Sequence, residues 1–243
     1  MGEPRAPQPE AGGAVAAGAD AAFLGIMERA GRYNAWLAGR ALPHLGRRVL
    51  DAGAGTGVFT EALAGRAERV VAVETDAALV PELRARLAGR ANVEVVHGDA
   101  LDPGLGDDFD SVVCFNVLEH VEDDVAALST LARRLVPGGR LLLLVPAHPF
   151  LYGPMDETVG HHRRYRRRDV RERLRRAGYA VDEVRLVNPI GAVGWLVAGR
   201  VLRRRVIPGG PLGLYDRLVP LLRVLDAARL PLGLSVWAVA HRP

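Results

Sequence analysis

The residues with the clearest chemical character form a glycine-rich turn in the first quarter of the chain. The turn, Asp51-Ala52-Gly53-Ala54-Gly55-Thr56-Gly57, follows a short apolar run and precedes a stretch with helical spacing. Glycine permits a tight turn and leaves no Cβ between the backbone and a ligand. In α/β proteins such a turn lies in the crevice outside the carboxyl end of a strand, where nucleosides bind. We therefore expect a nucleoside here, held by four residues of the turn: Gly53, Ala54, Gly55 and Gly57.

The spacing and charge of the turn narrow the choice of nucleoside. Its glycines follow G-x-G-x-G, whereas a diphosphate at a helix N-terminus calls for G-x-G-x-x-G. Asp51, at the start of the turn, would repel a diphosphate but can accept a hydrogen bond from an ammonium group. These features argue against a nicotinamide dinucleotide and favour S-adenosylmethionine, whose methionine half carries an ammonium group.

Acidic residues near the ends of the next two predicted strands complete the expected cofactor site. Glu74 follows Asp51 at about the interval where an acid accepts hydrogen bonds from both ribose hydroxyls, and Thr75 lies beside it. Asp99 is placed to bind the adenine amino group. Ala100 and Leu101 would then line the adenine ring. The alternative for each acid is a structural role in a loop or helix cap.

Residues able to transfer a proton follow the fourth predicted strand, in Asn116-Val117-Leu118-Glu119-His120-Val121. Methyl transfer depends mainly on positioning, and a base is needed only to take a proton from the acceptor. Glu119 and His120 are the first candidates, and Asn116 is expected beside the cofactor. The alternative is that Glu119 caps a helix and His120 only packs against the cofactor.

The elements that position these residues are visible in the apolar pattern. Apolar runs predict strands at residues 48–52, 70–74, 93–96, 111–115, 140–145, 180–187 and 234–240. Helical spacing predicts helices at residues 21–42, 58–64, 77–88, 123–135 and 168–177. Near-continuous apolar strands that alternate with helices predict an α/β fold, with a largely parallel sheet covered on both faces.

Two segments fall outside this alternation. Residues 1–20 lack an apolar period and are expected to form a flexible N-terminal tail. Residues 188–231 are too many for a tight connection between two strands and contain two amphipathic stretches, which predict a helical insertion. The remaining residues, 21–187 and 232–243, form the expected catalytic domain. The insertion could cover the substrate, bind a second copy in a homodimer, or rest on a membrane surface.

Composition limits the cellular setting and the partners. The single cysteine, Cys114, lies in an apolar run, which suits a reducing cytoplasm. No stretch approaches the roughly 20 consecutive apolar residues of a membrane span. The net charge is +4, but every basic residue counted is arginine, which suggests coding bias. We therefore expect no nucleic-acid partner from charge alone.

Over residues 33–179 the sequence resembles the class I S-adenosylmethionine-dependent methyltransferases. The resemblance implies a Rossmann-like, seven-stranded, mostly parallel sheet with an antiparallel last strand, and it implies the cofactor roles given above. Residues 116–120 resemble the N-x-L-E-H segment of many small-molecule methyltransferases, which borders the methyl group. The loop at residues 146–165 resembles P-A-H-P-x-L-Y-G-x-x-D…H-x-R-R-Y of one bacterial group. In that group the matching side chains face the substrate: His148, Tyr152, Asp156, His161 and Arg164.

The expected function is methyl transfer from S-adenosylmethionine to an oxygen of a small apolar, lipid-like or secondary-metabolite acceptor. The catalytic candidates are Glu119, His120, His148, Tyr152 and His161. No metal is expected. The alternative is a divalent cation on Asn116, Glu119 and His120 with His161 or His162, although the family's metal site has a carboxylate where this chain has Asn116. Two other functions stay open: binding the cofactor without methyl transfer, and RNA methylation through the arginines of residues 163–176, which lack interleaved aromatics.

Overall fold

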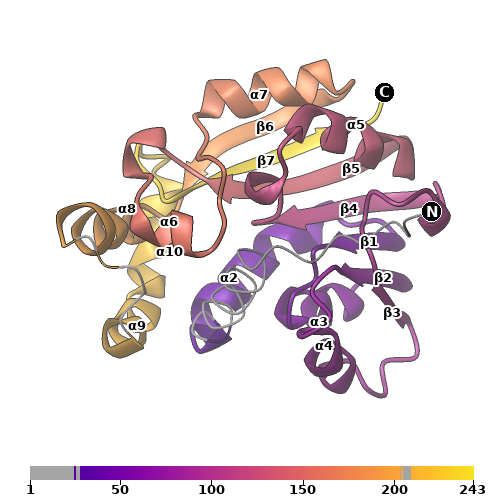
Figure 1. The fold of residues 1–243 in the computed structure, drawn as a ribbon, viewed down its shortest axis with the longest axis horizontal. Coiled ribbons are helices and arrows are strands. Elements are labelled where there is room, and N and C mark those ends of the chain that lie inside the picture. Colours follow the sequence, from indigo (N-terminus) through magenta and orange to yellow (C-terminus); the bar gives the residue numbers. More distant parts are fainter. Residues whose placement is uncertain (1–24, 26–27, 203, 205–208) are drawn as a thin grey trace, which may run out of the picture.

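The structure is a computed structural model, and it describes residues 25, 28–202, 204 and 209–243. Seven strands of the described residues form one sheet, and helices cover both of its faces (Figure 1). The strand order is β3-β2-β1-β4-β5-β7-β6, and β7 runs antiparallel to both of its neighbours. This arrangement confirms the expected Rossmann-like sheet with an antiparallel last strand.

The observed strands agree closely with those expected from the apolar runs. Val49 and Leu50 point to opposite faces of the sheet and are both fully buried, as a sheet covered on both sides requires. The strand bounds are β1 (Arg48–Ala52), β2 (Arg69–Glu74), β3 (Val93–His97), β4 (Phe109–Phe115), β5 (Leu135–Pro146), β6 (Ala180–Val187) and β7 (Ser235–His241).

The helices form two layers. α5 and α7 pack on one face of the sheet, whereas α2, α3 and α10 pack on the other. The longer helices are α2 (Gly31–Ala41), α3 (Val58–Ala64), α4 (Val80–Arg86), α5 (Asp124–Arg134), α6 (Pro154–Thr158), α7 (Arg167–Arg176), α8 (Pro189–Trp195), α9 (Gly209–Arg217) and α10 (Val219–Ala227). Four short 3₁₀ turns of the described residues are η1 (Leu42–His44), η2 (Pro103–Leu105), η3 (Leu118–His120) and η4 (Pro149–Leu151), and η5 (Leu196–Val201) is a π-helix that continues α8.

Several local expectations differ from the structure. The helix expected over residues 21–42 is interrupted, because Ala30 has non-helical backbone angles and α2 begins only at Gly31. The strand expected over residues 140–145 begins earlier, because β5 starts at Leu135, and its pairing with β4 shifts register between Leu135 and Arg140. The loop expected over residues 146–165 contains η4 and α6. The tail expected at residues 1–20 lies outside the described residues.

Residues 188–231 separate β6 from β7, and their described part is largely helical. Asn188 caps the start of α8, and its side chain accepts a hydrogen bond from the backbone N–H of Gly191 (2.8 Å). α9 and α10 follow and pack against α2. None of the described helices is both long enough and apolar enough to span a bilayer.

A buried carboxylate fastens α10 to the rest of the fold. Asp226 is 4% exposed, and its Oδ2 lies 2.5 Å from a guanidinium nitrogen of Arg40 in α2. The same oxygen lies 2.6 Å from a guanidinium nitrogen of Arg185 in β6. The Arg40 guanidinium also stacks over the rings of Trp36 and Trp237, at 5.5 and 5.4 Å from their centroids. This ion-pair clasp joins the insertion to both α2 and the sheet.

Candidate active site

The glycine turn after β1 has the backbone form that glycine makes possible. Gly53, Gly55 and Gly57 all have positive φ, at +78°, +56° and +86°. A Cβ on Gly53 would lie 2.3 Å from a methyl carbon of Val117, and one on Gly57 would lie 2.8 Å from a methyl carbon of Leu83. Two of the glycines are therefore required by packing within the protein as well as by their backbone angles. The turn presents Gly53, Ala54 and Gly55 to a cavity of about 480 Å³.

Glu74, at the end of β2, holds the turn in place. Its Oε2 accepts a hydrogen bond from the backbone N–H of Gly55 (2.7 Å), and its Oε1 accepts one from the N–H of Asp76 (2.8 Å). Each carboxylate oxygen has a second lone pair, so the group can still accept hydrogen bonds from hydroxyls in the cavity. Glu74 and Thr75 both line the cavity, as expected for residues at the ribose.

Asp51 lies behind the turn. Its Oδ2 accepts a hydrogen bond from the Thr60 hydroxyl (2.6 Å), and the residue is 3% exposed. Burial raises the pKa of Asp51 to about 6, against the Thr60 hydrogen bond, which lowers it. Among the described residues that line the cavity, neither Asp51 nor Gly57 appears. The ammonium-binding role of Asp51 stays a prediction.

The adenine-binding residues expected after β3 are also away from the cavity. Asp99 Oδ1 accepts a hydrogen bond from the backbone N–H of Leu101 (2.9 Å), so it stabilises its own turn. Asp99, Ala100 and Leu101 do not appear among the described residues of the cavity wall. The wall at this end consists instead of Thr75, Asp76 and Leu79. The adenine assignments stay predictions.

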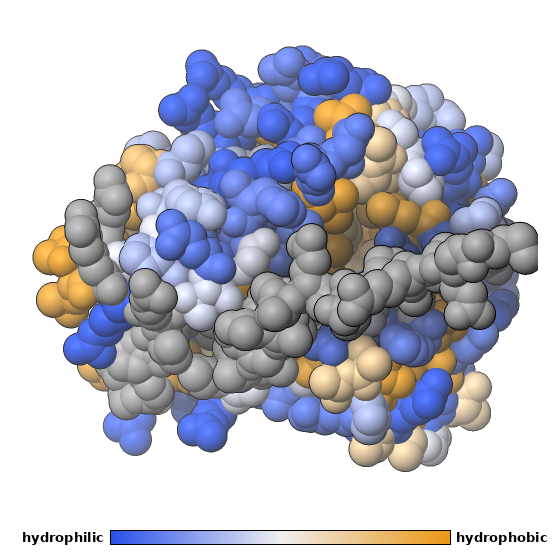
Figure 2. All heavy atoms as spheres, in the orientation of Figure 1, coloured by the Kyte–Doolittle hydropathy of each residue, from blue (hydrophilic) through white to orange (hydrophobic). Residues whose placement is uncertain are grey.

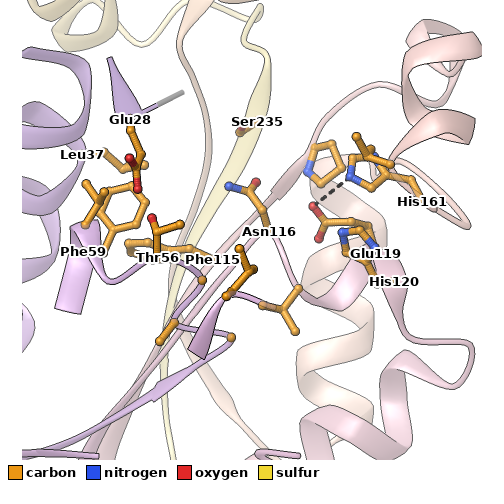
Figure 3. Close-up of a pocket in the computed structure, with 18 of the residues that line it drawn as sticks. Glu28, Leu37, Thr56, Phe59, Phe115, Asn116, Glu119, His120, His161 and Ser235 are labelled. Carbon is orange, nitrogen blue, oxygen red and sulfur yellow. Dashed lines mark ion pairs between the residues drawn. The ribbon is translucent and has the colours of Figure 1, made fainter. Parts of the chain in front are cut away.

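Three titratable side chains meet on the opposite wall (Figure 3). Glu119 and His120 come from η3, directly after β4, and His161 comes from the loop after α6. His161 Nε2 lies 3.7 Å from Glu119 Oε1, and the rings of His120 and His161 are 4.8 Å apart at their centroids. Asn116, at the end of β4, lies between this group and the glycine turn, with φ at +54°. The structure therefore brings three catalytic candidates together.

The electrostatics of these residues differ. Burial, and then the neighbouring His161 and His162, lower the pKa of His120 to about 4. His120 is therefore a neutral imidazole near neutral pH. Glu119 is fully buried, with its carboxylate directed at His161.

Asp156 anchors His161 from behind. Its Oδ1 lies 2.9 Å from His161 Nδ1 and 2.7 Å from Arg164 Nε, and its Oδ2 accepts a hydrogen bond from the N–H of Gly153 (3.1 Å). Asp156 is fully buried. The guanidinium group of Arg164 stacks 4.4 Å from the ring centroid of Trp195, at the end of α8. This network fixes the His161 ring and joins it to the insertion.

Tyr152 and His148 support the loop, and neither lines the cavity among the described residues. The Tyr152 hydroxyl donates to the backbone carbonyl of His161 (2.8 Å), and burial raises the pKa of Tyr152. His148 has φ at +63° and packs its ring against Phe150, with centroids 5.2 Å apart. Their catalytic roles stay predictions. In the structure both residues belong to the segment that carries His161.

Part of the wall was not expected from the sequence. Tyr33, Asn34 and Leu37 in α2 line the cavity, as do Trp195 in α8 and Ser235 in β7. The apolar spacing of α2 and α8 indicated buried faces without showing what those faces would cover. Apolar side chains on this wall suit an acceptor with a large apolar surface.

Comparison with known proteins identifies the domain. Residues 50–143, from β1 to β5, match a family described as a methyltransferase domain. A demethylmenaquinone methyltransferase of Clavibacter sepedonicus is 41% identical over 102 residues, which cover 42% of each chain. A ubiquinone biosynthesis O-methyltransferase of Paracidovorax citrulli is 36% identical over 108 residues, covering 43% of this chain and 45% of the relative. The matches thus span less than half the length of these two relatives.

A solved structure extends the likeness in fold. An S-adenosylmethionine-dependent methyltransferase from Mesorhizobium loti superposes with a TM-score of 0.59 at 20% identity, covering 86% of this chain and 98% of that one. Fold, glycine turn and family match together define a methyltransferase domain. Residues 50–143 thus match a methyltransferase domain, and the chain shares the fold of that S-adenosylmethionine-dependent methyltransferase.

The residues present fit the cofactor of this class. The turn presents Gly53, Ala54 and Gly55 to the cavity, and the Glu74 carboxylate on the same wall is an acceptor suited to a diol. The glycine turn and Glu74 are the described residues best placed to hold S-adenosylmethionine, and their roles in binding it stay predictions.

Proposed function

We propose that this chain transfers the methyl group of S-adenosylmethionine to an oxygen of a small apolar acceptor, with His161 as the base. The observation that carries the proposal is the position of His161, which lines the same cavity as the glycine turn and is held by two carboxylates. The names of the two relatives specify quinones, and one specifies an O-methyltransferase, which supports an apolar acceptor with a hydroxyl group.

His161 has the arrangement of a base. Asp156 accepts the proton on Nδ1, so the neutral ring carries its lone pair on Nε2, toward Glu119 and the cavity. Nε2 can take the hydroxyl proton from the acceptor. The imidazolium that forms lies between the carboxyl groups of Asp156 and Glu119, which are 2.9 and 3.7 Å from its two ring nitrogens. Bound S-adenosylmethionine supplies an electrophilic methyl group.

The apolar wall supports the choice of acceptor. Leu37, Phe59, Phe115 and Trp195 line the cavity together with the three titratable residues. Such a wall removes water from the acceptor and favours a large apolar or aromatic molecule over a charged one. The insertion contributes Trp195, which supports a role for residues 188–231 in covering the acceptor.

A labelling experiment tests the proposal and its two alternatives. The protein is incubated with methyl-labelled S-adenosylmethionine and, separately, with a hydroquinone of low polarity, total RNA, or an extract of its host. We expect label in an organic-soluble ether and none in RNA. Label in RNA would establish the RNA alternative. Cofactor binding without label in any fraction would establish a protein that binds S-adenosylmethionine without transferring methyl.

The structure weakens the case for RNA. Arg163 and Arg173 both pair with the buried carboxylate of Asp124, at 3.2 and 2.6 Å. Arg164 is buried against Asp156 and Trp195. Three arginines of the basic stretch therefore have structural partners.

A divalent cation at the same place is the second candidate, and one observation favours it. Ligand atoms of Glu119, His120 and His161 all lie within 4.8 Å of one another. Two imidazoles with one carboxylate suit zinc, iron or manganese better than magnesium. Asp156, on the far nitrogen of His161, would be the carboxylate that commonly orients a metal-binding histidine.

Removal of metal separates the two mechanisms. If His161 acts as the base, dialysis against a chelator should change the rate by less than about twofold, because its lone pair is free to take a proton. Added zinc should then inhibit by occupying Nε2. A rate that falls more than about tenfold and returns with zinc or manganese would establish the metal mechanism. Methyl transfer before and after dialysis is the measurement.

A further inference from the structure

An exposed apolar patch lies on the outer side of the insertion. Val193, Val197 and Val201 are 53%, 48% and 68% exposed and recur at intervals of four residues along α8 and η5. This interval places them on one side of a helix. Phe150, in the adjoining η4, is 59% exposed. We call these four residues, with Leu196 and Leu202, the apolar patch. Figure 2 shows apolar surface at the left edge of the molecule, where Figure 1 places α8.

The patch is fixed beside the active site. A Cβ on Gly199 in η5 would lie 2.6 Å from the terminal carbon of Met155, so η5 rests closely on the loop that carries Asp156 and His161. Trp195 points the other way, toward Arg164 and the cavity. One side of α8 therefore lines the cavity, while the other carries the patch.

The exposed charges of the described insertion are of one sign, although the adjoining α6 carries the exposed acid Glu157. Residues 189–232 contain two acids, and both are turned inward: Asp226 is in the ion-pair clasp, and Asp216 accepts a hydrogen bond from the backbone N–H of Tyr33 (3.0 Å). The arginines described in this segment with exposed side chains are Arg204, Arg217, Arg223 and Arg229. The outer surface of the described insertion therefore combines apolar side chains with positive charge alone.

We propose that the apolar patch rests on the surface of an anionic lipid bilayer. Exposed valines and phenylalanine can enter the boundary between headgroups and acyl chains, while arginines remain at the level of the anionic headgroups. A two-fold contact between copies would bring the same positive surface against itself, which charge repulsion opposes. A bilayer offers negative charge and apolar depth together. It would also place the cavity beside the membrane, where apolar acceptors concentrate.

Vesicle flotation tests this proposal and needs no methyl transfer, so its failure would leave the proposed function untouched. The full chain is mixed with vesicles of phosphatidylcholine alone, or with about one third phosphatidylglycerol, at low and high salt. We expect binding to the anionic vesicles that weakens at high salt. The double variant Val197→Asp/Val201→Asp should reduce this binding at least about tenfold, because charges enter the headgroup boundary unfavourably.

A matched control variant tests whether the change in net charge alone reduces vesicle binding. Arg66→Glu changes the net charge by the same amount on an exposed residue after α3, at the amino edge of the sheet, and should retain most of the binding. Binding of S-adenosylhomocysteine to each variant shows that it is folded. The proposal is overturned if the wild type does not float with anionic vesicles, if it floats equally with neutral ones, or if the double variant floats as well as the wild type. A wild-type dimer that binds no vesicles and that the double variant dissociates would make the patch an interface between copies.

Discussion

Glu74→Ala should weaken the binding of S-adenosylmethionine about 100-fold or more. The carboxylate can accept hydrogen bonds from two ribose hydroxyls, and each hydrogen bond to a charged group contributes about 1.5–3 kcal/mol. It also holds the N–H groups of Gly55 and Asp76, so its removal releases two segments of the cavity wall. Calorimetric titration with S-adenosylmethionine and S-adenosylhomocysteine measures the effect.

Two variants serve as controls for this prediction. Glu74→Gln keeps the shape and one carbonyl oxygen, so its affinity should fall between those of the wild type and Glu74→Ala. Glu94→Ala removes an exposed acid from the neighbouring strand β3, where it forms an ion pair with Arg69, and should leave affinity unchanged. A loss of less than about threefold for Glu74→Ala would remove Glu74 from the cofactor site.

His161→Ala should lower kcat by about 10²–10⁴-fold, the usual contribution of a general base. The KM for S-adenosylmethionine should change little, because Glu74 and the glycine turn are on the opposite wall of the cavity. Added imidazole should restore part of the rate, since the vacated space opens into the cavity. Steady-state methyl transfer at saturating cofactor gives both constants.

Variants of two residues beside His161 distinguish the loss of a base from a structural effect. His162→Ala removes an exposed side chain whose backbone N–H donates to the carbonyl of Glu119, and kcat should stay within about twofold of the wild type. Asp156→Asn should lower kcat through the orientation of His161, and imidazole should not rescue it, because the ring is still present. A loss below about tenfold for His161→Ala would exclude His161 as the base.

The sheet could be predicted from the sequence because each central strand is a short apolar run bounded by polar residues. The expected strand at residues 48–52 coincides with β1, and the expected helix at residues 58–64 coincides with α3. The helix expected over residues 21–42 was less predictable. Apolar spacing continues through residue 30, where the backbone leaves the helical region, and spacing carries no sign of such a break.

Some residues of the candidate site could be picked out from the sequence, but their arrangement could not. Glu119 and His161 are both identifiable from the sequence, but their proximity depends on backbone contacts between distant segments, such as the hydrogen bond from His162 N–H to the Glu119 carbonyl (2.8 Å). The part played by α2 in the wall depends on packing of Tyr33 against Tyr215, with ring centroids 5.5 Å apart. Contacts of this kind leave no periodic pattern in a single sequence. At Asp99 the structure shows a hydrogen bond within its own turn, and the adenine-binding role predicted from its spacing stays a prediction.

The ion-pair clasp at Asp226 limits the movements by which the acceptor and its product can enter and leave the cavity. Swinging α10 away from the sheet would part the Asp226 carboxylate from Arg40 and Arg185 and would expose apolar side chains that α10 buries, such as Leu222. Such an open form is therefore disfavoured. The acceptor and its methylated product would therefore enter and leave the cavity while α10 stays packed against the sheet. Smaller movements around Trp195 would control the passage of both molecules. Turnover would then not require the whole insertion to move away from the sheet.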